Sequence, residues 1–305
     1  MPEGFLRGIV PAIVTPFRPD ERIDYQAWQE LIEIQLASGV HGLFVLGGQG
    51  EFFALNEEER EVAARFCAQT VDGRVPVYVN VGAVTTLEAV RLAQKAEGDG
   101  VDAVVAVTPY YVRPSEAELV DHYIEICHSV RLPVFAYNIP ERTGVSLTPE
   151  ILGRIAAICE NFAGLKDSSG DLDAIAKYRS GGLEVFMGRD HLILEGLKRG
   201  CAGAVTACAN VAPRAFVQLY EAYHGGDMER AGRLQTLVEP LRAAFALGTF
   251  PAVVKEAMQL IGLRAGRCRR PVGPLAVEAR YKLAEALEPL RAEGLLAAPA
   301  RIAAN

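Results

Sequence analysis

Residues 162–171 read FAGLKDSSGD, a short apolar run that ends in a lysine and breaks into a polar turn. The run is continuous rather than alternating in polarity, which is typical of a parallel strand buried on both faces. Burial would lower the pKa of the Lys166 amine, and an amine that is neutral near pH 7 can attack a carbonyl to form a Schiff base. The alternative is a structural lysine that pairs with Asp167.

Seven further apolar runs share this character and set the fold. The predicted strands are Gly8–Val14, Gly42–Leu46, Val75–Val81, Ala103–Thr108, Pro133–Asn138, Ala163–Lys166, Glu184–Met187 and Ala204–Thr206. They begin about 20 to 34 residues apart, which suits one strand and one helix per unit. Eight units predict a (β/α)8 TIM barrel that ends near Gly225. An open doubly wound sheet is the alternative, but no dinucleotide-binding fingerprint follows the first strand.

Capping residues indicate where the helices begin. The predicted starts are Asp24, Asn56, Thr85 or Thr86, Ser115, Thr148–Pro149, Asp171, His191 and Pro213. After Gly226 the pattern is helical only, over Met228–Leu247, Phe250–Ile261 and Pro274–Leu296. We therefore expect residues 1–225 to form the barrel with the active site, and residues 226–305 to form a C-terminal three-helix region packed on it.

Composition excludes several classes of protein. Half of the 305 residues are hydrophobic and the net charge is −7, which argues against a nucleic-acid footprint. No apolar run is long enough to span a membrane, and the first residues, MPEGFLRGIVP, show no signal pattern. The six cysteines form no CxxC pair, as expected of reduced thiols in a cytoplasmic protein. The five histidines lack metal-ligand spacing, so we expect neither a metal nor a cofactor.

The active site of a barrel lies at the C-terminal ends of its strands. The sequence places GGQGE (47–51), TPYY (108–111), YNIPERTG (137–144), Lys166, Gly188 and Val205 there. The glycine-rich GGQGE is either an anion-binding turn with exposed N–H groups or simply a tight connection. The tyrosines at 110 and 111 could equally be loop packing. Together, an amine, tyrosines, an arginine and an anion-binding turn suit carbonyl chemistry on an anionic substrate.

These motifs, in this order, resemble the dihydrodipicolinate synthase / N-acetylneuraminate lyase family of pyruvate-type class I aldolases. The resemblance implies that Lys166 forms a Schiff base with pyruvate or another 2-oxo acid, and that Tyr137 relays protons. It also implies that Tyr111 reaches into a neighbouring subunit, so that the enzyme is a homodimer or homotetramer. Gly188 and Val205 correspond to pocket-lining positions. The backbone N–H groups of Gly48 and Gln49 are expected to hold the carboxylate of the 2-oxo acid.

Two features bear on the second substrate. The family usually carries hydroxyl residues where this chain has Gly48 and Gln49, so a proton relay through a hydroxyl at position 48 is lost. An amide at position 49 resembles the branch that cleaves 4-hydroxy-2-oxoglutarate. Arg142 lies in an ArgThrGly that is similar to the synthase branch, and its guanidinium is suited to a distal carboxylate. We therefore expect a short, carboxylated aldehyde as partner, although an exposed loop arginine is the alternative.

Several functions remain open. The leading hypothesis is a dihydrodipicolinate synthase-like (4-hydroxy-tetrahydrodipicolinate synthase) or 4-hydroxy-2-oxoglutarate aldolase-like enzyme that condenses or releases pyruvate. A second is a 2-keto-3-deoxy sugar acid aldolase or dehydratase, or an N-acetylneuraminate lyase-like enzyme. A third, of another class, is a catalytically silent paralogue that binds a 2-oxo acid, against which the presence of Lys166 and Tyr137 argues.

Overall fold

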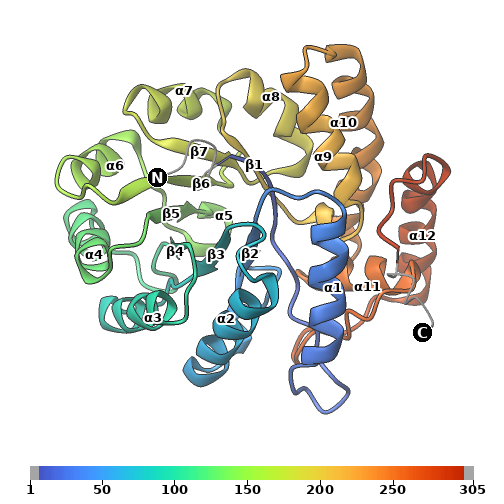
Figure 1. Cartoon of the computed structure of the whole chain (residues 1–305), viewed down its shortest axis with the longest axis horizontal. Coiled ribbons are helices and arrows are strands. Elements are labelled where there is room, and N and C mark those ends of the chain that lie inside the picture. The colour runs from blue at the N-terminus through green and yellow to red at the C-terminus, as the bar shows by residue number, and fades with distance from the viewer. Residues whose placement is uncertain (1–6, 299–305) are drawn as a thin grey trace.

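Eight parallel strands form one sheet that curls into a barrel in the computed structural model, which describes residues 7–298 (Figure 1). Residues 1–6 and 299–305 lie outside the described residues. They include the ends of the two predicted domains and part of the N-terminal stretch in which no signal pattern was found. The strands are β1 Gly8–Pro11, β2 Leu43–Val45, β3 Val77–Asn80, β4 Ala103–Val107, β5 Val134–Asn138, β6 Phe162–Asp167, β7 Glu184–Met187 and β8 Gly203–Thr206. Each overlaps a predicted run, so the TIM-barrel prediction is confirmed.

The strand order explains how the barrel closes. Neighbouring strands follow the order β1-β8-β7-β6-β5-β4-β3-β2, and a parallel bridge between Ala12 and Phe44 joins the remaining pair. All five residues of β4 are buried, as are all five of β5. Strands packed on both faces are apolar along most of their length, which is why the sequence shows long apolar runs, and polar residues such as Asn138 lie at the strand ends.

The helices ring the strands in Figure 1. They are α1 Tyr25–Ala37, α2 Glu57–Val71, α3 Thr86–Gly98, α4 Glu116–Ser129, α5 Pro140–Thr143, α6 Pro149–Ala156, α7 Leu172–Ser180, α8 Ile193–Lys198 and α9 Pro213–His224. Asp24, Asn56, Thr85, Ser115, Thr148 and Asp171 cap their helices as predicted.

One predicted helix start is wrong. His191 lies inside a short 3-10 turn, η2 Asp190–Leu192, and helix α8 begins only at Ile193. The sequence pattern did not reveal the turn because the hydrogen bonds of Asp190 are made with residues that follow much later in the chain. Its carboxylate accepts hydrogen bonds from the Thr206 hydroxyl and, at 3.0 Å, from the Cys208 backbone N–H.

The C-terminal region packs against the barrel on the side of α9 (Figure 1). It contains α10 Met228–Ala243, the 3-10 turn η4 Ala244–Leu247, α11 Ala252–Leu260 and α12 Val277–Ala292. Its buried side chains, such as Leu234, Val254 and Leu287, join the same hydrophobic core as the barrel strands. No helix within residues 7–298 is long and apolar enough to cross a membrane.

Candidate active site

A cavity of about 300 Å³ opens beside the C-terminal ends of the strands. Most of the residues predicted from the sequence line it, although they come from separate loops: Gly48, Gln49, Tyr137, Arg142, Lys166, Gly188 and Val205. The cavity wall is completed by residues of the C-terminal region, among them Arg242, Phe245 and Phe250. This region therefore contributes directly to the candidate site.

Lys166 lies in an apolar and aromatic environment near the end of β6. The residue is 6% exposed, and Nζ lies 3.8 Å from the ring centroid of Tyr137 and 4.6 Å from that of Phe44. It makes no ion pair with any residue of the described range 7–298. Burial lowers the pKa of the Lys166 amine from 10.5 to about 7, and the charge of Asp190 opposes the shift only in part. A substantial fraction of this amine is therefore neutral at pH 7.

The alternative in which Lys166 pairs with Asp167 does not occur. Successive residues of a strand point to opposite faces, so the two side chains diverge. The Asp167 carboxylate accepts hydrogen bonds from Asn138 Nδ2 at 2.8 Å and from Ser169 Oγ at 2.7 Å. Burial raises the pKa of Asp167, and these two bonds oppose that shift. Asp167 thus belongs to the structural support behind the strand and leaves the amine to the cavity.

Tyr137 lies directly opposite Lys166 in the pairing of β5 with β6. Burial raises the pKa of its phenol to about 12, while a side-chain hydrogen bond with Ser168 and the charges of Arg142 and Arg189 work in the other direction. The phenol is therefore protonated at neutral pH, close to the amine and beside a second hydroxyl. Ser168, which also lines the cavity and is buried, was not singled out from the sequence.

Gly188 makes room for this Ser168 hydroxyl. A Cβ atom at position 188 would collide with Ser168 Oγ and would lie 2.8 Å from the Asp167 carbonyl oxygen. The Gly188 N–H donates to that same carbonyl at 2.6 Å, which fixes the end of β7 against the end of β6. A glycine at this position therefore keeps the serine hydroxyl in the cavity.

The GGQGE turn presents free donors to the cavity. The backbone N–H groups of Gly48 and Gln49 make no hydrogen bond to any residue between 7 and 298. Thr15 Oγ1 donates to the Gly50 carbonyl at 2.7 Å, and Leu46 and Glu51, on either side of the turn, adopt positive φ values of 57° and 56°. Two adjacent free N–H groups in a fixed turn suit a carboxylate.

A buried ion pair holds the turn from behind. Lys255 Nζ, on α11, lies 2.5 Å from Glu51 Oε1, and the side chains are 1% and 0% exposed. Lys255 also donates to the Arg267 carbonyl at 3.1 Å, and Glu51 Oε2 accepts the Arg269 backbone N–H at 3.0 Å. Burial lowers the pKa of Lys255, and the Glu51 charge opposes this. The C-terminal region thereby anchors the residue that ends the turn.

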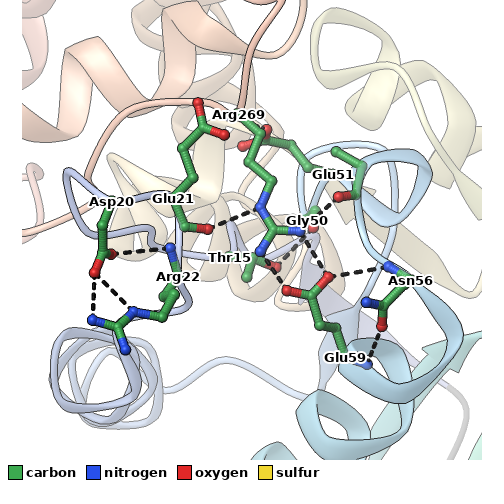
Figure 2. Close-up of polar contacts among 10 residues, drawn as sticks. Thr15, Asp20, Glu21, Arg22, Gly50, Glu51, Asn56, Glu59 and Arg269 are labelled. Carbon is green, nitrogen blue, oxygen red and sulfur yellow. Dashed lines mark hydrogen bonds and ion pairs between the residues drawn. The ribbon is translucent and has the colours of Figure 1, made fainter.

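Arg269 extends this anchor to the start of α2, as Figure 2 shows. Its guanidinium donates to the Glu21 carbonyl at 3.0 Å and to the Ala54 carbonyl at 2.7 Å, and pairs with the Glu59 carboxylate. Glu59 in turn accepts the backbone N–H of Asn56 at 3.1 Å within the α2 capping box. The loop before α1 and the segment from Glu51 to the start of α2 are thus both tied to Arg269.

Three arginines line the cavity, of which the sequence analysis named one. Arg189 is already engaged, since it pairs with Glu141 at 2.6 Å and donates to the Ser168 carbonyl at 2.7 Å. Arg142 and Arg242 make no ion pair within the described part of the chain. Arg189 directly follows Gly188 at the end of β7, so the rule that active-site residues lie at strand ends could have identified it from the sequence. Arg242 lies on α10, where a helical pattern does not tell which residues face a distant cavity.

Tyr111 does not line the cavity of its own chain. It is 97% exposed and its backbone is left-handed, with φ at 74°. Its neighbour Tyr110 is half-buried and packs edge-on against Phe52, with the ring centroids 5.8 Å apart. The predicted contribution of Tyr111 to another subunit therefore stays a prediction.

Comparison with known proteins identifies the family of this chain. The model of the Dihydrodipicolinate synthetase family matches residues 5–290. The chain belongs to this family. A 4-hydroxy-tetrahydrodipicolinate synthase of Methanoculleus marisnigri is 38% identical over 274 residues, covering 88% of this chain and 94% of the relative. The probable 2-dehydro-3-deoxy-D-pentonate aldolase YjhH of Escherichia coli is 38% identical over 287 residues, covering 90% and 94%.

A solved structure of the family also superimposes closely. YagE of Escherichia coli, a prophage protein of the dihydrodipicolinic acid synthase family determined in complex with pyruvate, has a TM-score of 0.90 and 33% identity. The match covers 93% of this chain and 98% of that one. The chain is accordingly an enzyme of the lyase and aldolase type that this family comprises.

Proposed function

We propose that this family member is a class I aldolase whose Lys166 forms a Schiff base with pyruvate or another 2-oxo acid. The observation that carries the proposal is the Lys166 amine, which is buried, faces the cavity, lacks a carboxylate partner within residues 7–298 and has a pKa near 7. Such an amine is a nucleophile at neutral pH. The YagE structure in complex with pyruvate supports the choice of 2-oxo acid.

The chemistry follows from the groups around the amine. Lys166 Nζ attacks the keto carbon, and loss of water gives an iminium that draws electrons from the adjacent carbon. Removal of a proton there gives an enamine, whose carbon attacks an aldehyde; the reverse sequence cleaves the same C–C bond. The ring of Tyr137 lies beside the amine, and its protonated phenol is suited to move these protons. The free N–H groups of Gly48 and Gln49 suit the carboxylate of the 2-oxo acid.

The second substrate is a short aldehyde that carries a carboxylate, such as aspartate semialdehyde or glyoxylate. Arg142, at the cavity wall and without an ion-pair partner in the described chain, supports this choice. The enzyme is then dihydrodipicolinate synthase-like or 4-hydroxy-2-oxoglutarate aldolase-like. A hydroxyl at position 48 is absent, and the Ser168 hydroxyl, bonded to Tyr137, is suited to relay the proton instead.

A 2-keto-3-deoxy sugar acid aldolase is the second candidate. The observation in its favour is the E. coli relative, whose name describes a probable 2-dehydro-3-deoxy-D-pentonate aldolase and which matches almost the whole chain. In that case the aldehyde carries hydroxyl groups in place of a carboxylate, and Arg142 contributes less to its binding.

We also propose that the enzyme works as a homodimer or homotetramer in the cytoplasm. Tyr111 and Val112, which follow β4, and Phe53, in the 3-10 turn η1 Phe52–Ala54, are exposed residues, at 97%, 45% and 48%. Their burial against a second copy would carry the Tyr111 phenol toward the other subunit's cavity. All six cysteines, each within the described residues, have free thiols, which suits a reducing compartment.

A panel of aldehydes tests the reaction. Pyruvate and enzyme are mixed with aspartate semialdehyde, glyoxylate, glycolaldehyde or D-glyceraldehyde, and condensation products are scored by mass spectrometry. Products from the first two support the leading proposal, and products from the last two alone support the sugar acid candidate. Absence of product from all four, with pyruvate bound, points to the silent paralogue.

A further inference from the structure

Phe250 joins the C-terminal region to the candidate site. It lies between η4 and α11, and its ring lines the cavity together with Gly48 and Arg142. Gly48 follows β2 and Arg142 follows β5, so three distant parts of the chain meet here. Phe250 has no role in Schiff-base formation or proton transfer.

The tip of the Phe250 ring occupies the space that a side chain at position 48 would need. A Cβ atom at Gly48 would lie 2.8 Å from Phe250 Cζ and 3.4 Å from Cε1. The backbone of Gly48 is outside the left-handed region, so the chain conformation alone would allow any residue. Any side chain at position 48, a hydroxyl residue included, would therefore have to displace the Phe250 ring from this place.

The face of the same ring carries Arg142. The guanidinium carbon of Arg142 lies 3.8 Å from the Phe250 ring centroid. The N–H donors of a guanidinium lie in its own plane, so a guanidinium that stacks on a ring directs them past the edge of the ring. There they are free to bind a carboxylate. By contrast, Arg189 is neutralised by Glu141. Phe250 therefore holds an unneutralised cation in one orientation at the cavity wall.

We propose that Phe250 is a positioning residue that selects substrates with a distal carboxylate, by holding Arg142 against a ring seated on Gly48. The inference rests on the proposed function and names its substrate class: compounds with a 2-oxo acid group at Lys166 and a carboxylate at the other end. Phe250 acts through Arg142 and does not itself touch the reacting atoms.

The test uses two matched 2-oxo acids, so that it does not depend on the identity of the aldehyde. 2-Oxoglutarate carries a distal carboxylate, whereas 2-oxopentanoate has the same number of carbons without it. The full-length enzyme is titrated with each acid and with pyruvate, reduced with borohydride, and the fraction of adduct is measured by mass spectrometry. The variants are Phe250→Leu, Arg142→Ala, their combination, and Phe245→Leu. Phe245 is the matched control because it lines the same cavity but lies under Arg242, 4.9 Å away.

The expected result is selective. Phe250→Leu raises the half-saturating concentration of 2-oxoglutarate by about 2- to 30-fold, the range of a cation–π contact. It changes the values for 2-oxopentanoate and pyruvate much less, and it adds nothing in the Arg142→Ala background. Phe245→Leu has a markedly smaller effect on 2-oxoglutarate.

Three results would overturn the inference: equal losses for 2-oxoglutarate and 2-oxopentanoate, additive effects of Phe250→Leu and Arg142→Ala, or no preference of the wild type for 2-oxoglutarate over 2-oxopentanoate. Each can occur while pyruvate still forms its adduct, and then the proposed Schiff-base chemistry at Lys166 stands. If no 2-oxo acid, pyruvate included, forms an adduct with the wild type, the proposed function fails as well.

A second test uses Gly48. Because a Cβ atom there displaces the Phe250 ring, Gly48→Ala should weaken 2-oxoglutarate trapping in the wild type. In the Phe250→Leu background the same change should cost less, since the ring is gone. Equal costs in the two backgrounds would contradict the proposed seating of the ring on Gly48.

Discussion

Lys166 Nζ lies 3.8 Å from the ring centroid of Tyr137, its direct partner across strands β5 and β6. Burial shifts the pKa values of the two groups in opposite directions, and both shifts favour imine formation. It lowers the pKa of the amine to about 7 and raises the pKa of the phenol to about 12. At neutral pH the pair thus offers a nucleophile and a proton donor side by side.

The pH dependence of imine formation should report the amine. Only the neutral form of Lys166 attacks a carbonyl, so the rate of adduct formation at low pyruvate should rise from pH 5.5 and level off above about pH 7. The measurement is the initial rate of borohydride-trapped adduct in a series of buffers. A rate that keeps rising up to pH 10 would show that the amine retains its ordinary pKa.

Lys166 should also cost stability in a pH-dependent way. Its pKa falls from 10.5 to about 7 on folding, at about 1.4 kcal/mol per unit, so burying the charged form costs several kcal/mol below pH 7. Lys166→Met should therefore be more stable than the wild type at pH 6, with the difference shrinking as the pH rises toward 10. Urea denaturation at several pH values measures it, and a constant difference would argue against the shifted pKa.

Removing the phenol should separate chemistry from binding. Tyr137→Phe should lose about 10²- to 10⁴-fold in turnover, the usual contribution of a positioned acid or base, while pyruvate binding is largely kept. Steady-state kinetics and adduct trapping give the two quantities. Turnover at the wild-type rate would make Tyr137 a packing residue.

Ser168→Ala should give a smaller loss of the same kind. The hydroxyl hydrogen-bonds to Tyr137 and lowers the pKa of the phenol, so its removal should raise that pKa and reduce turnover by about 5- to 10-fold. Ser38→Ala, which removes a hydroxyl bonded to the Ile34 carbonyl at the end of α1, is the control. Equal rates for Ser168→Ala and wild type would exclude Ser168 from the relay.

The buried pair of Lys255 and Glu51 should be needed as a pair. Lys255→Met leaves a buried carboxylate without its partner and should destabilise the protein by about 3–5 kcal/mol, with weaker pyruvate trapping because the GGQGE turn loosens. Adding Glu51→Gln should recover much of the stability, since the amide still accepts the Arg269 N–H. Chemical denaturation of the single and double variants tests this, and strictly additive losses would contradict it.

The strands and the lining of the cavity were predictable for a physical reason. Parallel strands buried on both faces produce uninterrupted apolar runs, and the ends of such strands meet at one face of a barrel. That logic brings Lys166, Tyr137, Gly48 and Arg142 together without any knowledge of the packing. The sequence also shows that Gly48 departs from the hydroxyl residue that the family usually carries at this position.

The contribution of the C-terminal region was not predictable in the same way. Helical periodicity shows which face of a helix is buried, but it does not show what that face meets. Phe250 contacts Arg142, Lys255 contacts Glu51, and Arg242 lines the same cavity as these loops. Only the packing reveals that these distant parts of the chain meet. The contact between Gly48 and the Phe250 ring could not be predicted for the same reason.

The central claim is tested most directly by the site of the covalent adduct. The enzyme is incubated with pyruvate, reduced with borohydride, digested and mapped by mass spectrometry, with Lys255 as an internal control because it is buried but paired with Glu51. The account predicts one three-carbon adduct per chain, on Lys166, and none on Lys166→Met. An unmodified Lys166, or an adduct at another lysine that survives in Lys166→Met, would contradict it.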